Sequence, residues 1–158
     1  MVEILSDTQR KAEQICHQGI ELCDEKDLPG AHGLFTQAYQ LDPTSPKIIS
    51  WLGYTTAVVE RKVQKGVELC RKAVEGEVPD ALFYRNLGKA FLLMNNKRAA
   101  IGAFAKGLQI DKGNRHILNE WKMLGFRRRV LFSFLDRDHP LNKWIGKLTW
   151  YLTHRNKS

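Results

Sequence analysis

Long apolar runs are missing from this chain of 158 residues. The uncharged run at 48–59 has 12 residues, whereas a membrane-spanning helix needs about 20. Residues 1–10 have neither a basic start nor an extended apolar core, so we expect no secretory signal peptide. These absences favour a cytoplasmic protein, with a peripheral position at the inner membrane face as an alternative.

Cysteines are few, and none has metal-site spacing. The chain has three, Cys16, Cys23 and Cys70. On one helix, Cys16 and Cys23 would lie about 10 Å apart along the axis, too far for a disulfide. We therefore expect reduced thiols, no metal and no cofactor.

Catalytic motifs are also missing. No glycine-rich phosphate loop is present, and the one dense cluster of titratable residues, Asp-Arg-Asp-His at 136–139, directly precedes Pro140. Such a cluster is typical of a turn and a helix cap. We therefore predict that the protein is not an enzyme.

Acidic residues are scarce in the last part of the chain. Residues 1–114 contain 15 Lys and Arg against 14 Asp and Glu, a net charge of +1. Residues 115–158 contain 10 against 3, a net charge of +7. The total of +8 is therefore concentrated in the last segment, which predicts two electrostatically different parts.

Three glycines mark an internal repeat. Gly19, Gly53 and Gly88 are separated by 34 and 35 residues. A second small residue follows each glycine, and a core residue follows four positions later. The small residues are Ala31, Gly66 and Ala100, and the core residues are Phe35, Cys70 and Phe104. Small residues at fixed positions let two helices approach closely, so each period predicts a helix pair.

This pattern resembles the tetratricopeptide repeat, a helix–turn–helix unit with the signature W-x2-L-G-x2-Y followed by A-x3-F. The third repeat fits it best, with Tyr84-x2-Leu87-Gly88-x2-Phe91 and then Ala100-x3-Phe104. The resemblance implies an all-α, right-handed superhelical solenoid with repeats at about 12–45, 46–79 and 81–114. The second repeat departs from the signature at Thr56, Gly66 and Cys70, and has one extra residue in its turn.

A fourth signature begins and is not completed. Trp121-x2-Leu124-Gly125 copies its first half, and Gly125 lies 37 residues after Gly88. No A-x3-F follows, so we predict a capping helix at about 115–130 that ends a TPR-like array over 1–130.

The remaining segment, 131–158, is basic. Its apolar residues recur at helical spacing, which predicts a C-terminal amphipathic helix after Pro140. The basic tail comprises Arg127, Arg128, Arg129, Lys143 and Lys147. It could be a solvated cap, could bind an anionic membrane surface, or could meet an acidic protein. Nucleic acid is not expected, because no base-stacking platform accompanies the cations.

The first helix of each pair lines a concave groove in this family, and the resemblance therefore implies a peptide-binding groove. Its predicted residues are Ile20, Tyr54, Arg85, Lys89, Leu92, Lys122 and Phe126. The leading prediction is a non-enzymatic interaction module for a protein or peptide partner with hydrophobic anchors and acidic residues. Alternatives are a chaperone of a bacterial secretion-type system and a membrane adaptor, and the oligomeric state stays open.

Some family members grip C-terminal carboxylates with a clamp of Lys and Asn side chains. The corresponding positions here hold Cys16, Ile20, Trp51, Leu82 and Asn86. No cation is among them, so binding of acidic heat-shock-protein tails is not expected.

Overall fold

The computed structural model describes residues 6–76 and 78–124, and within these ranges it contains seven helices and no strand. The helices are α1 (Asp7–Asp24), α2 (Leu28–Leu41), α3 (Pro46–Val59), α4 (Val63–Val74), α5 (Ala81–Leu93), α6 (Lys97–Ile110) and α7 (Arg115–Met123). The chain divides into two compact units, residues 1–118 and 119–158. Of the second unit, only 119–124 is described.

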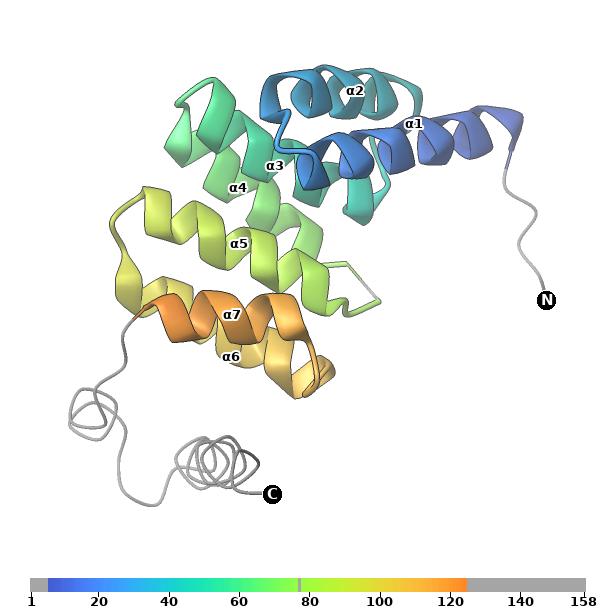
Figure 1. Ribbon diagram of the computed structural model, residues 1–158. Helices are drawn as coiled ribbons and strands as arrows, with labels where there is room; N and C mark the ends of the chain where they lie inside the picture. The colour runs from blue at the N-terminus through green and yellow to red at the C-terminus, as the bar shows by residue number, and fades with distance from the viewer. Residues whose placement is uncertain (1–5, 77, 125–158) are drawn as a thin grey trace, which may run out of the picture. The chain divides into compact units, whose positions relative to one another are not determined.

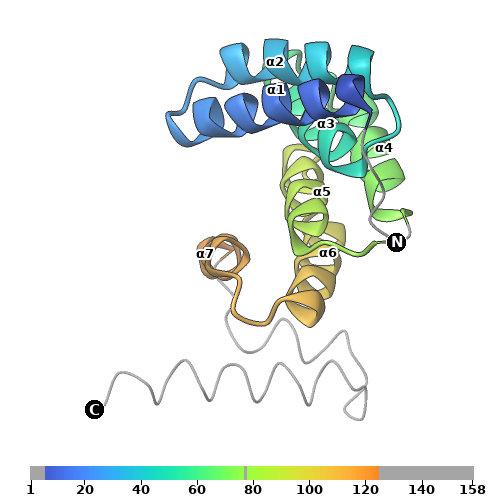
Figure 2. The ribbon, with the colours of Figure 1, turned by 90° about the vertical axis from the view of Figure 1, so that its right-hand side faces the viewer.

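Consecutive helices pair as the repeat predicts. α1 packs against α2, α3 against α4, and α5 against α6, while α3 also contacts α2 and α5 (Figure 1). The view turned by 90° shows the same pairing from the side (Figure 2). The all-α helical-repeat prediction is therefore confirmed for the part of the chain that the structure describes.

Local capping signals fix the starts of several helices. The Ser6 hydroxyl accepts a hydrogen bond from the backbone N–H of Gln9, and the Gln9 side chain accepts one from the Ser6 N–H. This capping box satisfies two of the four N–H groups that a helix start leaves unbonded. Asp27 and Asn96 cap α2 and α6 through the N–H groups three residues later.

The turn inside each pair contains one residue with left-handed backbone conformation. These residues are Lys26, Arg61 and Asn95, with φ of 69°, 58° and 60°. Gly53 lies eight residues before Arg61, whereas Gly19 and Gly88 lie seven residues before their counterparts. The extra residue of the second repeat is thus in the last part of α3. The sequence pattern predicted this extra residue in the turn between the two helices, and that prediction was wrong.

The burial of α3 explains why its sequence from 48 to 59 has no charged residue. Ten consecutive residues, 48–57, are buried, because α3 has neighbours on both sides in the array. Helices at the edge bury only one stripe; α1, for instance, buries Ala12, Cys16 and Gly19. The uncharged run is therefore an internal helix of the repeat array, and no described helix is long and apolar enough to cross a bilayer.

The start of α7 packs on the last repeat. Ile117 is fully buried, and a Cβ added to Gly107 of α6 would lie 2.6 Å from its Cδ1. The small residue at 107 thus leaves room for Ile117. Gly125 and the predicted C-terminal amphipathic helix lie outside the described residues.

Candidate functional site

The predicted groove residues of α3 and α5 come together. Lys89 Nζ lies 4.0 Å from the centroid of the Tyr54 ring, a cation–π distance. Tyr54 is 8% exposed, while Lys89 and Arg85 are half-buried. Because Arg85 precedes Lys89 by one helical turn, both cations belong to the same face of α5.

Cys23 connects this cluster to α1. Burial raises the pKa of its thiol to about 11, while the positive charges of Lys89 and Arg85 act in the opposite direction. Electrostatic interactions weaken with distance, so the effect of both cations on this thiol assigns Cys23 to their neighbourhood. Side chains of α1, α3 and α5 therefore contribute to one surface, which we call the α1–α3–α5 face: Cys23, Tyr54, Arg85 and Lys89.

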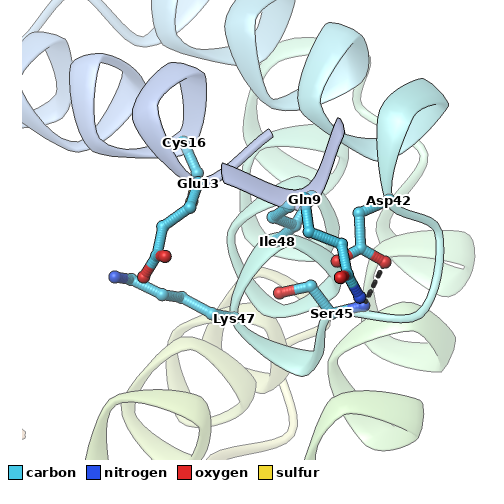
Figure 3. Close-up of a pocket in the computed structure, with 7 residues that line it drawn as sticks. All are labelled: Gln9, Glu13, Cys16, Asp42, Ser45, Lys47 and Ile48. Atoms are coloured by element: carbon cyan, nitrogen blue, oxygen red, sulfur yellow. Dashed lines mark hydrogen bonds between the residues drawn. The ribbon is translucent and has the colours of Figure 1, made fainter. Parts of the chain in front are cut away.

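A small pocket lies between α1 and the start of α3 (Figure 3). Its volume is about 170 Å³, and its lining is Gln9, Glu13, Cys16, Asp42, Ser45, Lys47 and Ile48. In Figure 3 the Glu13 carboxylate and the Lys47 ammonium group point toward one another. Asp42 accepts hydrogen bonds from Thr44 and Ser45 and so holds the loop before α3.

The other predicted groove residues are distributed more widely. Ile20 and Leu92 are half-buried on α1 and α5, and Lys122 is exposed on α7. Phe126 and the basic-tail residues Arg127, Arg128, Arg129, Lys143 and Lys147 lie outside the described residues. Of the predicted set, the structure brings together Tyr54, Arg85 and Lys89.

The positions that hold a carboxylate clamp in some family members are largely buried here. Trp51 stacks on Phe35, with ring centroids 5.5 Å apart. Asn86 is fully buried, and its Nδ2 donates a hydrogen bond to Ser50 Oγ at 3.1 Å. This hydrogen bond holds the Asn86 side chain in the core and links α3 to α5.

One polar network was not predicted from the sequence. His32 of α2 lies 3.0 Å from Thr55 Oγ1 through Nδ1 and 2.8 Å from Glu60 Oε1 through Nε2. Hydrogen bonds from Lys62 and then His32 lower the pKa of Glu60. The partners are 23 and 28 residues apart, and no spacing rule relates residues at such separations.

The thiols are poor nucleophiles. Burial raises the pKa of Cys16 to about 11 and that of Cys70 to about 12, so both are neutral thiols at neutral pH, and the thiolate is the reactive form. Within 6–76 and 78–124, no group of three or more His, Cys, Asp or Glu residues could hold a metal ion.

No protein-family model and no curated protein matches the sequence. Solved structures do match. The TPR domain of Arabidopsis OM64 is 17% identical with a TM-score of 0.61, over 75% of this chain and 97% of that one. The first TPR of Spaghetti (RPAP3), bound to the HSP90 peptide SRMEEVD, is 18% identical with a TM-score of 0.59, over 78% and 96%. The Sgt2 TPR domain from Aspergillus fumigatus is 19% identical with a TM-score of 0.59, over 73% and 77%.

Because the sequence identities to these structures are low, the similarity concerns the backbone fold. They agree with the glycine period and with the pairing of α1–α2, α3–α4 and α5–α6. The chain therefore has the tetratricopeptide-like helical-repeat fold that its sequence predicts.

Proposed function

We propose that this protein is a non-enzymatic interaction module that holds a segment of a partner protein on its α1–α3–α5 face. The observation that carries the proposal is the placement of Lys89 over the Tyr54 ring, one helical turn from Arg85. A cation held on an aromatic ring presents positive charge next to apolar surface. That combination suits a peptide with acidic residues and hydrophobic anchors.

The similar structures support binding of a peptide but not the same peptide. The Spaghetti domain was solved with the HSP90 peptide SRMEEVD. In this chain, Trp51 and Asn86 occupy two positions of the family's carboxylate clamp and are buried. We therefore infer that the partner segment is acidic and internal to its protein, gripped by Arg85 and Lys89 rather than by its terminal carboxylate.

The first test uses charge reversal on α5. We expect Arg85→Glu plus Lys89→Glu to weaken binding of a fluorescein-labelled peptide of alternating Glu and Leu by at least about tenfold, because both cations lie near the bound acidic side chains. Fluorescence anisotropy on the full chain measures the affinity, and circular dichroism confirms the helix content.

The matched control carries the same charge change elsewhere. Lys65→Glu plus Lys97→Glu alters exposed lysines on α4 and α6. An equal loss of affinity in this control would show that net charge, and not the α1–α3–α5 face, governs binding. Unchanged affinity after reversal of Arg85 and Lys89 would contradict the proposed site directly.

A further inference from the structure

A second surface lies on other helices of the array. Side chains of α4, α5 and α6 enclose a trough of about 480 Å³, large enough for one or two side chains of a partner. Its lining is Arg71, Val74, Glu75, Tyr84, Leu87, Phe91, Ala99, Gly102, Ala103 and Lys106. We call it the α4–α6 trough. None of these residues belongs to the α1–α3–α5 face.

Small residues on α6 leave the trough open. Ala99, Gly102 and Ala103 line one side, and a Cβ added to Gly102 would meet no atom within 4 Å. The same repeat positions on α4 hold the longer side chains Lys65, Glu68 and Leu69. The third repeat thus departs from the second at the residues that would otherwise fill this space.

The open trough combines an apolar floor with positive charge. Leu87 and Phe91 form the floor, and the Arg71 guanidinium lies 5.4 Å from the centroid of the Phe91 ring. Arg71 and Lys106 are exposed on opposite helices, and neither forms an ion pair with another described residue. Glu75 is the single acidic side chain in the lining.

We propose that the α4–α6 trough is a second docking site, whose occupant is an acidic amphipathic helix of a partner protein. One or two apolar side chains of that helix enter over Gly102 and Phe91. Its carboxylates pair with Arg71 and Lys106 at the edges. This is the helix-in-groove mode, in which apolar anchors supply affinity and rim charges select the partner.

The test closes the trough and keeps a matched control. Gly102→Glu places a long, negatively charged side chain at the opening, and its Cβ would meet no atom within 4 Å. Gly33 occupies the same repeat position on α2 and also has open space beyond its Cα, so Gly33→Glu makes the same change away from the trough. The probe is a fluorescein-labelled helical peptide with Leu on one face and Glu on the other, titrated against the full chain. A peptide with Lys in place of Glu serves as the charge control.

We expect Gly102→Glu to weaken binding of the acidic peptide by about tenfold or more, and Arg71→Glu plus Lys106→Glu by about fivefold or more, because the first removes both space and attraction. Gly33→Glu leaves the affinity within about twofold.

Equal binding of the Lys peptide, or equal losses in Gly33→Glu and Gly102→Glu, would overturn the proposal. The proposal would also be overturned if only Arg85→Glu plus Lys89→Glu abolished binding of the acidic peptide, because the peptide would then bind the α1–α3–α5 face. Binding to anionic phospholipid vesicles that depends on Arg71 and Lys106, in place of peptide binding, would identify a membrane surface as the partner and overturn it too.

Discussion

The second repeat is built differently from the first and third. In the outer repeats an aromatic ring covers the glycine of the first helix: Phe35 lies over Gly19, and Phe104 over Gly88. In the second repeat, Cys70 stands where the ring would be. A Cβ on Gly53 would lie 2.8 Å from both the Cys70 backbone N and the Gly66 backbone O.

The difference shows two solutions to one packing problem. A large ring fills the space between two helices that stay apart, whereas small residues let the two backbones touch. The touching pair, α3 and α4, includes the helix with buried residues on all sides. Loss of an aromatic residue from the signature is thus compensated by closer approach of the two helices.

The largest expected effect comes from the ring positions. Phe104 is fully buried, and Phe104→Ala should lower the free energy of unfolding by about 3–5 kcal/mol, because it leaves a large cavity. Cys70→Ala should cost about 1 kcal/mol, because it removes a single sulfur atom from an already close contact. Urea denaturation measures both. Similar losses would mean that the two repeats are packed alike.

A medium effect should come from the glycine of the second repeat. Gly53→Ala should lower the free energy of unfolding by about 1–3 kcal/mol, because the added methyl group meets backbone atoms that cannot move aside. The control is Gly33→Ala on α2, where no atom lies within 4 Å. That change should raise stability by about 0.5–1 kcal/mol through helix propensity. A stabilising Gly53→Ala would disprove the close approach of α3 and α4.

The smallest effect concerns the start of α4. Lys62 has φ −85° and ψ 65°, close to the −83° and 75° of Asp27 at the start of α2, yet its side chain makes no cap. Lys62→Asp should therefore add a hydrogen bond to the backbone N–H of Lys65. It should raise stability by about 0.5 kcal/mol, after loss of the exposed ion pair with Glu60.

Two variants isolate the cap from the ion pair. Lys62→Ala removes the ion pair and adds no cap, so it should be neutral or slightly destabilising. Asp27→Ala removes an existing cap and should cost about 1 kcal/mol. If Lys62→Asp were no more stable than Lys62→Ala, the α4 start would differ from the α2 start in more than its side chain.

Sequence reasoning recovered the features that depend on residues close together in the chain. The capping box at Ser6 and Gln9 depends only on partners three residues apart, so the sequence pattern is enough to encode it. The helix pairs followed from a glycine period that a repeat enforces. Arg85 and Lys89 were both among the predicted groove residues, and they share one face of α5 because they are one helical turn apart.

The contacts that were not predicted cross between repeats. His32 joins Thr55 and Glu60 of the next repeat. Asn86, which the resemblance placed at a binding position, instead donates to Ser50 in the core, 36 residues away. The repeat position of Asn86 did not predict its burial, because burial depends on which side chains face each other across the α3–α5 interface.

The sequence by itself thus determined the all-α class, the helix–turn–helix period and the helix-start caps, since hydrogen bonds between near neighbours and the spacing of small residues encode them. Only the tertiary structure decided that α3 and α4 touch, that Lys89 lies on the Tyr54 ring and that α4 and α6 leave a trough over Phe91. The physical reason is that these features depend on distances between helices. Those distances are fixed by the combined volume of many side chains, and no single motif specifies that volume.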